Sequence, residues 1–139
     1  MEPLVLSMRF KGHATQPAGE PPEVDVRSET ESVTVEGGDG AGIDAVSYET
    51  HVTFTSETTF TESGRVAVGS GGDALLISTV GNGHIGPSAD ASILHGAVTF
   101  RIDGGEGTLD GASGLITSNF QLQPESGDVT DYQVAVIFR

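Results

Sequence analysis

The chain has 139 residues, a length that suits one domain built around one hydrophobic core. Its 20 acidic and six basic residues give a formal net charge of −14, which disfavours nucleic acid and anionic membranes as partners. Because the sequence contains no cysteine, disulfides, zinc–thiolate sites, iron–sulfur clusters and cysteine nucleophiles are excluded.

The amino-terminal segment MEPLVLSMRF lacks the basic start and the long apolar run of a signal peptide. No stretch of the chain approaches the ~20 apolar residues of a membrane-spanning helix. We therefore expect a cytoplasmic protein.

Strict alternation of apolar and polar residues recurs along the chain, and this pattern predicts β-strands with one buried face. The opposite faces hold Arg9, His51, His95 and Arg101, which a shift of one residue would bury, so the pattern specifies the register. The rows expected to face inward are Leu4, Leu6, Met8 and Phe10 in residues 4–10; Val46, Tyr48, Val52 and Phe54 in residues 46–55; Leu94, Val98, Phe100 and Ile102 in residues 92–102; Ile116, Phe120 and Leu122 in residues 114–122; and Tyr132, Val134, Val136 and Phe138 in residues 129–138.

Two further segments depart from this pattern. Residues 12–30 are rich in proline, show no alternation, and are predicted to form a long irregular loop over one end of the fold. Residues 74–80, ALLISTV, are apolar on both faces and are predicted to form a strand that is covered on both sides.

Short strands separated by glycine-rich turns favour an all-β fold, either a sandwich or a barrel. The strand order favours one antiparallel barrel of about eight strands, closed or nearly closed, over residues 1–139. Closure would remove the exposed strand edges that such segments otherwise present. The interior of an eight-stranded barrel is filled by side chains or holds one small ligand.

Two elements near the carboxyl end carry a family resemblance: His95-Gly96-Ala97-Val98-Thr99-Phe100 and Gly107-Thr108-Leu109-Asp110-Gly111-Ala112-Ser113-Gly114. Residues 81–138, which contain both, resemble the carboxyl-terminal half of allene-oxide-cyclase-like barrels. Plant dirigent proteins carry a similar glycine-containing run, and bacterial spirotetronate cyclases look like distant relatives. The resemblance implies a small barrel that closes rings without a cofactor.

The sequence lacks the residues that several classes of enzyme require. There is no G-x-S-x-G element, and no inward histidine is predicted that could activate a serine. None of the predicted inward rows contains Asp or Glu, so the carboxylate pair of a glycosidase is not expected. The histidines show no metal-binding spacing, and Glu49 and His51 form only a surface pair, so we expect neither a metal nor a cofactor.

The inward rows are apolar apart from a few hydroxyl groups, which suits a site that holds a flexible substrate in its reactive conformer. Tyr48 and Tyr132 are the predicted catalytic residues, because a tyrosine hydroxyl can bond a substrate carbonyl. The predicted substrate contacts are Met8, Val52, Phe54, Phe100, Ser118 and Phe120.

The leading hypothesis is a cofactor-independent cyclase of the isomerase or pericyclic type, for example one that performs a Diels–Alder-type ring closure. Its substrate would be hydrophobic, derived from a polyketide or a lipid, and held inside the barrel. Two alternatives remain open: a non-catalytic barrel that binds an apolar small molecule, and a filled barrel that serves as a structural subunit.

Four apolar residues fall in the predicted outward rows: Ile93, Leu115, Val129 and Ile137. Because they lie on segments expected to be neighbours, they predict a shared apolar patch and a homodimer formed through it.

Overall fold

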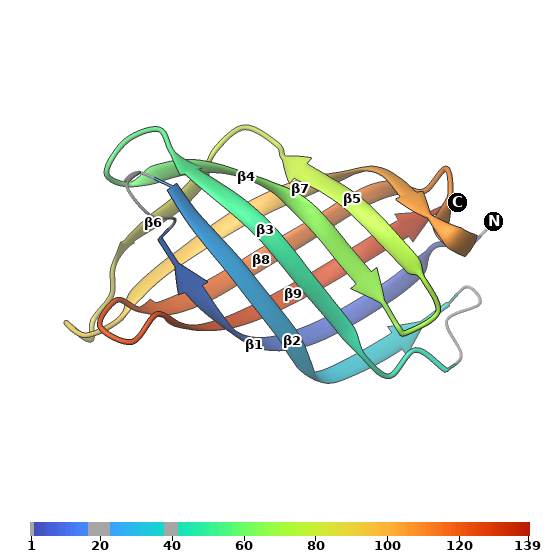
Figure 1. The fold of residues 1–139 in the computed structure, drawn as a ribbon, viewed down its shortest axis with the longest axis horizontal. Coiled ribbons are helices and arrows are strands. Elements are labelled where there is room, and N and C mark those ends of the chain that lie inside the picture. Colours follow the sequence, from blue (N-terminus) through green and yellow to red (C-terminus); the bar gives the residue numbers. More distant parts are fainter. Residues whose placement is uncertain (1, 17–22, 38–41) are drawn as a thin grey trace.

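The computed structural model describes residues 2–16, 23–37 and 42–139. Within these ranges, nine strands form a single sheet that curls into a barrel (Figure 1). Their bounds are Leu4–Thr15 (β1), Glu23–Glu36 (β2), Val46–Phe54 (β3), Thr59–Val68 (β4), Asp73–Thr79 (β5), Gly83–Pro87 (β6), Leu94–Glu106 (β7), Ser113–Gln123 (β8) and Asp128–Phe138 (β9). One short 3-10 helix, η1 (Gly107–Leu109), follows β7.

The barrel closes because β3, at one end of the strand order β3-β2-β1-β9-β8-β7-β5-β4, also pairs with β4 at the other end. All these pairings are antiparallel. Strand β5 lies between β4 and β7, and the short strand β6 occupies the same gap farther along, where it pairs with the first residues of β4 and of β7. Because β5 and β6 together fill one strand position, the barrel has eight positions. The predicted closed antiparallel barrel of about eight strands is confirmed.

Four of the five predicted inward rows lie inside the barrel. The rows of β1, β3, β7 and β8 form most of the core, and Phe10, Phe100, Leu6 and Ile116 are among the largest fully buried side chains. Arg9, His95 and Arg101 are exposed, and His51 is half-buried on the outer face. Near the carboxyl end of β4, Leu109 of η1 and Ala112 are buried and close the core.

The row predicted for β9 is wrong by one residue. Ala135 and Ile137 are 1% exposed, whereas Tyr132, Val134 and Phe138 are 54%, 43% and 45% exposed. The cause is the pairing with β1, in which Leu6 lies opposite Ala135 and Leu4 lies opposite Ile137. Residues opposite each other in an antiparallel pair share a face, so the buried row of β1 fixes the buried row of β9.

Three other expectations need correction. Residues 12–15 and 23–30, predicted as part of an irregular loop, belong to β1 and β2, and residues 17–22 of that segment lie outside the described residues. Leu76 and Val80 are exposed, so the segment 74–80 is not covered on both sides. Val129 and Ile137 are buried, so the outward patch predicted to contain them does not exist in that form.

Candidate functional site

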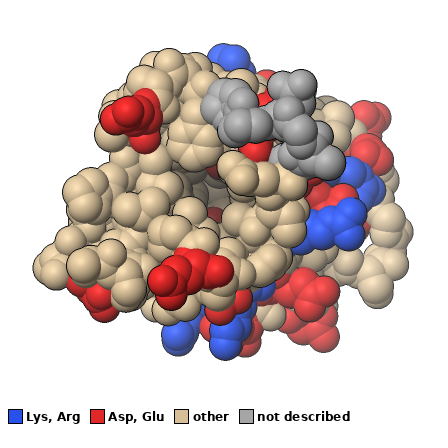
Figure 2. Space-filling model, turned by 60° about the vertical axis from the view of Figure 1, so that its left-hand side comes forward, with Lys and Arg blue, Asp and Glu red and all other residues tan. Residues whose placement is uncertain are grey.

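An internal cavity of about 70 Å³ lies at one end of the barrel, where β1, β3 and β8 end and β2, β4 and β9 begin. This end is the left-hand side of Figure 1, and the space-filling view turned toward it shows a hollow in the surface (Figure 2). Five residues predicted to form the site line the cavity: Tyr48, Val52, Phe54, Ser118 and Phe120. Two carboxylates, Glu62 and Asp131, line it with them.

Asp131 accepts three hydrogen bonds inside the barrel although it is only 3% exposed. The Tyr48 hydroxyl and the Gln133 amide nitrogen donate to its Oδ2 at 2.8 and 2.9 Å, and the Ser118 hydroxyl donates to its Oδ1 at 2.7 Å. Burial raises the pKa of Asp131, and these three bonds oppose the rise because they stabilise the carboxylate. Asp131 is thus a buried acidic group whose charge is held by neutral donors.

Among the residues described, Glu62 on β4 has a single side-chain donor. The Thr50 hydroxyl donates to its Oε2. Burial raises the pKa of Glu62 to about 7, the Thr50 bond opposes the rise, and the nearby Asp131 charge adds to it. A carboxyl group with this pKa can both donate and accept a proton near neutral pH, which is what general acid–base catalysis requires.

Burial and the neighbouring Asp131 carboxylate also raise the pKa of Tyr48 well above its ordinary value. Tyr48 therefore acts as a hydrogen-bond donor, and its ring stands edge-on to that of Phe10 with the centroids 4.8 Å apart.

Three phenylalanines form the apolar wall of the cavity. The ring of Phe60 stands edge-on to those of Phe54 and Phe120, with centroids 6.0 and 5.9 Å apart. Such edge-to-face pairs are favourable because the positive ring edge meets the negative ring face. We call this cavity, with its three phenylalanines and two carboxylates, the aromatic cleft.

Glycines leave room for these rings. A Cβ at Gly96 would lie 2.4 Å from the Phe120 ring and 2.3 Å from the His84 carbonyl oxygen. Gly96→Ala should therefore lower the free energy of unfolding by about 1–3 kcal/mol, the usual cost of overpacking. Urea denaturation of this variant beside Gly86→Ala, where a Cβ meets nothing within 4 Å, measures the effect. Equal stability of the two variants would contradict this close packing.

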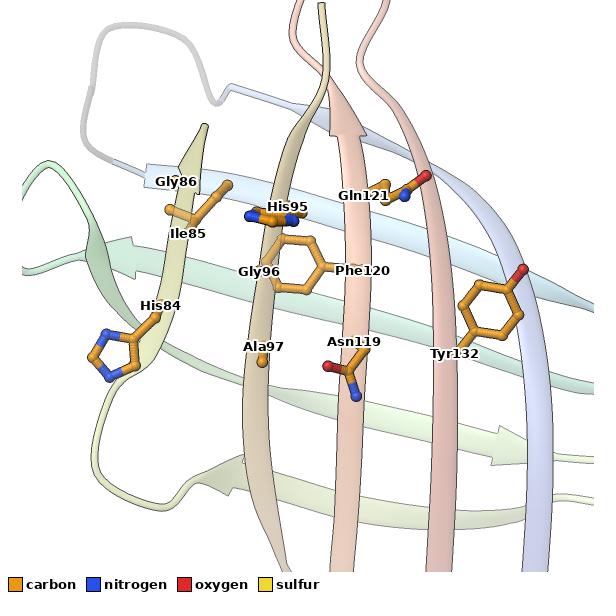
Figure 3. Close-up of a pocket in the computed structure, with 10 residues that line it drawn as sticks. All are labelled: His84, Ile85, Gly86, His95, Gly96, Ala97, Asn119, Phe120, Gln121 and Tyr132. Carbon is orange, nitrogen blue, oxygen red and sulfur yellow. The ribbon is translucent and has the colours of Figure 1, made fainter. Parts of the chain in front are cut away.

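The remaining predicted site residues lie elsewhere. Met8 and Phe100 are buried in the core but do not line the cavity. Tyr132 lies on the outer face of β9, with the Arg9 guanidinium 5.7 Å from its ring centroid, so its predicted place in the lumen is wrong. Figure 3 shows it at the edge of an outer groove of about 570 Å³, together with His84, His95, Asn119 and Gln121.

The expectation that no carboxylate faces inward was wrong for Glu62 and Asp131. Glu62 had a signal in the sequence, because Phe60, Glu62, Val66 and Val68 share one phase of β4. Asp131 had none, because the apolar residues of its strand favour the opposite phase. Its position depends on the pairing with β1, in which it lies opposite the buried Phe10.

Within the described ranges, no group of three or more His, Cys, Asp or Glu side chains is placed to hold a metal ion. In the same part of the chain, no helix is long and apolar enough to cross a membrane.

No protein-family model matches the sequence, and no curated protein matches it. Among solved structures, the chain is similar to the pterocarpan synthase dirigent protein GePTS1. The similarity has a TM-score of 0.56 at 18% sequence identity and covers 100% of this chain and 87% of that one. At this identity the likeness shows the fold alone, a barrel like that of the dirigent protein.

Proposed function

We propose that this barrel is a cofactor-independent acid–base catalyst of the cyclase or isomerase class. Its substrate would be a small apolar molecule, part of which enters the aromatic cleft. The observation that carries the proposal is the placement of two carboxylates, the half-buried Glu62 and the buried Asp131, on one apolar cavity with different hydrogen-bond partners. Neighbouring acids whose surroundings differ in this way are suited to separate acid and base roles.

The two carboxylates divide the proton transfers of a ring closure. Glu62, with one donor and a pKa of about 7, gives its proton to a carbonyl or hydroxyl oxygen of the substrate. Asp131, stabilised as a carboxylate by three donors, takes a proton from the substrate atom that attacks. Return of that proton from Asp131 to Glu62 restores the protein, so the net reaction is an isomerisation with no co-reactant.

Two further observations fit this function. The cavity of about 70 Å³ accommodates the reacting group rather than a whole natural product, so the rest of the substrate would lie in the hollow at the barrel end. A protein of this fold bears the name pterocarpan synthase, which supports a synthetic role for such a barrel. Tyr48 takes part through its bond to Asp131 rather than as a direct donor to the substrate.

The proton-transfer step can be tested with 5-nitrobenzisoxazole, a neutral apolar ring. A base removes its C–H proton, the N–O bond breaks, and the resulting phenolate absorbs visible light. We expect the protein to accelerate this reaction roughly 100-fold over acetate, within the 10²–10⁴ range of positioned bases. In the ring closure Glu62 gives up its proton, whereas in this assay the same group, once ionised, accepts one. The rate should therefore rise with pH through about 7.

Glu62→Gln should abolish the part of the rate that rises through pH 7. Glu57→Gln, which removes the same charge from an exposed position in the β3–β4 connection, should leave that rise intact. A rate that matches free acetate, or a rise through pH 7 that survives in Glu62→Gln, would contradict the proposal.

The second candidate is a filled barrel with no catalytic role. It is favoured by the cavity volume of about 70 Å³, well below the ~300 Å³ at which small-molecule pockets usually begin. In that case the Asp131 bonds only stabilise the fold, and neither the reaction above nor the binding described below should be observed.

A further inference from the structure

We propose that the aromatic cleft selects a small organic cation, namely a primary or methylated ammonium group, over neutral and anionic groups of the same shape. This inference rests on the proposed function only in placing the ligand in the same cleft. It concerns binding and does not require the catalytic step.

The first support is the charge of the cavity. Glu62 and Asp131 both line it, and none of its lining residues is Lys, Arg or His. The ion pairs found in the described part of the chain involve neither of them. Three hydrogen bonds stabilise the Asp131 carboxylate, whereas Glu62 accepts one from a side chain. A bound cation or a proton would supply the compensation that Glu62 lacks.

The second support is the aromatic lining. Phe54, Phe60 and Phe120 surround the same space as the two carboxylates. Aromatic rings attract cations electrostatically, and cages of such rings recognise quaternary and methylated ammonium groups. An inorganic metal ion would instead require several oxygen or nitrogen ligands, and no suitable group of three or more acidic, His or Cys side chains occurs among the residues described.

The third support is size and access. A cavity of about 70 Å³ has the volume of an ammonium head group, since one water molecule takes up roughly 30 Å³ in the liquid. Figure 2 shows acidic side chains on the surface around the hollow. Their negative charge attracts a cation toward the hollow. The rest of the ligand would lie in this hollow.

Three probes of nearly identical shape test the selection: benzylammonium, benzyl alcohol and benzoate, titrated by calorimetry at pH 8 in 0.15 M NaCl. At this ionic strength exposed charges farther apart than ~8 Å are largely screened, so the acidic surface contributes little. We expect benzylammonium to bind at least tenfold more tightly than benzyl alcohol, and benzoate not to bind. Equal affinities for the cation and the alcohol, or no binding of benzylammonium at millimolar concentration, would overturn the inference.

Variants locate the effect. Glu62→Gln should weaken benzylammonium binding about tenfold and leave benzyl alcohol unaffected, whereas Glu57→Gln should change neither. If the preference for the cation persists in Glu62→Gln, it comes from the acidic surface in general, and the proposed binding in the cleft is refuted. The three probes carry no reactive bond, so their binding does not depend on proton transfer. Binding can be observed when 5-nitrobenzisoxazole does not react, and the reaction can be observed when the probes do not bind. The two proposals can therefore fail separately.

A different observation concerns the outer face of β1, β9 and β8. The described residues include six exposed large apolar side chains, and four of them lie on this face: Leu115, Tyr132, Val134 and Phe138. Val136 lies between Val5 and Leu115 in the same sheet, which extends the apolar surface across the three strands. Large apolar patches of this kind mark interaction sites.

The charge of this face identifies its partner. The outward row of β8 contains no Asp or Glu, and that of β9 contains none after Asp128, in a chain with 20 acidic residues. The outward row of β1 carries Arg9 and Lys11. Two molecules of net charge −14 repel each other least when these faces meet, so we infer that the face binds a second copy of this chain.

Sedimentation equilibrium tests this self-association at micromolar concentration in 0.15 and 1 M NaCl. We expect an oligomer that Val134→Glu converts to a monomer, while Leu76→Glu, an equally exposed change on β5, leaves it intact. High salt should strengthen the association, because it screens the repulsion between the acidic surfaces. A monomer under both conditions, or an oligomer that tolerates Val134→Glu, would refute this interface.

Discussion

Glu62→Gln is expected to stabilise the barrel at pH 8 by about 3 kcal/mol. The folded protein raises the pKa of Glu62 from 4.5 to about 7, and each pKa unit of difference between folded and unfolded states corresponds to ~1.4 kcal/mol. The stability supplied by the protonated carboxyl is complete below the unfolded pKa and is lost as pH rises through about 7. Glutamine stays neutral throughout and still accepts the Thr50 hydrogen bond.

Urea unfolding of both proteins between pH 5 and pH 8 measures this effect. The two should differ little at pH 5, and the variant should become progressively more stable than the wild type toward pH 8. Subtracting the two curves removes the contributions of other groups, including His51, whose pKa is raised by its bonds to Asp25 and Glu23. A difference that is constant with pH would show that Glu62 titrates normally. Glu57→Gln serves as the exposed control.

Asp131→Ala is expected to have the opposite and larger effect, a loss of about 3–5 kcal/mol in the free energy of unfolding. It removes the acceptor for the Tyr48, Ser118 and Gln133 donors and leaves all three buried without it. Each buried polar group that loses its partner costs ~1–3 kcal/mol, and part of the total is recovered because the charge is no longer buried.

Asp131→Asn is the matched comparison, because an amide of the same shape retains an acceptor oxygen for this cluster. We expect it to recover most of the stability lost in Asp131→Ala. A double-mutant cycle with Tyr48→Phe then isolates the bond between the two side chains. Equal stability of Asp131→Ala and Asp131→Asn would mean that the hydrogen bonds of Asp131 do not hold the fold together.

The cavity itself could be predicted in part. Alternation places Tyr48, Val52 and Phe54 on one face of β3, and Ser118 and Phe120 on one face of β8. All five line the cavity. The same reasoning could have predicted that Glu62 faces inward, since it lies on the same face of β4 as Phe60 and Val66.

The segment that begins near residue 12 was harder to interpret from its residues. On the inward face of β2, the apolar Val24 and Val26 are followed by the polar Ser28 and Thr30, so the alternation of apolar and polar residues is weak. A bulge between Arg9 and Phe10 in the pairing with β1 then shifts the phase, and Val33 and Val35 take up the core side. Pairing with strands on both sides makes β2 a strand although its own pattern does not.

By itself the sequence determined an all-β chain, a closed barrel and the buried face of four of its strands, because alternation reports which face avoids water. The position of Asp131 was decided by the tertiary structure alone. Both faces of β9 carry apolar residues, and the outward row, with Tyr132, Val134 and Phe138, is the more hydrophobic of the two. Hydrogen-bonded pairing with β1 and β8 nevertheless fixes which row faces the core, and it turns Asp131 toward Tyr48 and Ser118. The three hydrogen bonds formed there compensate for a buried carboxylate, which hydrophobicity alone would have left in water.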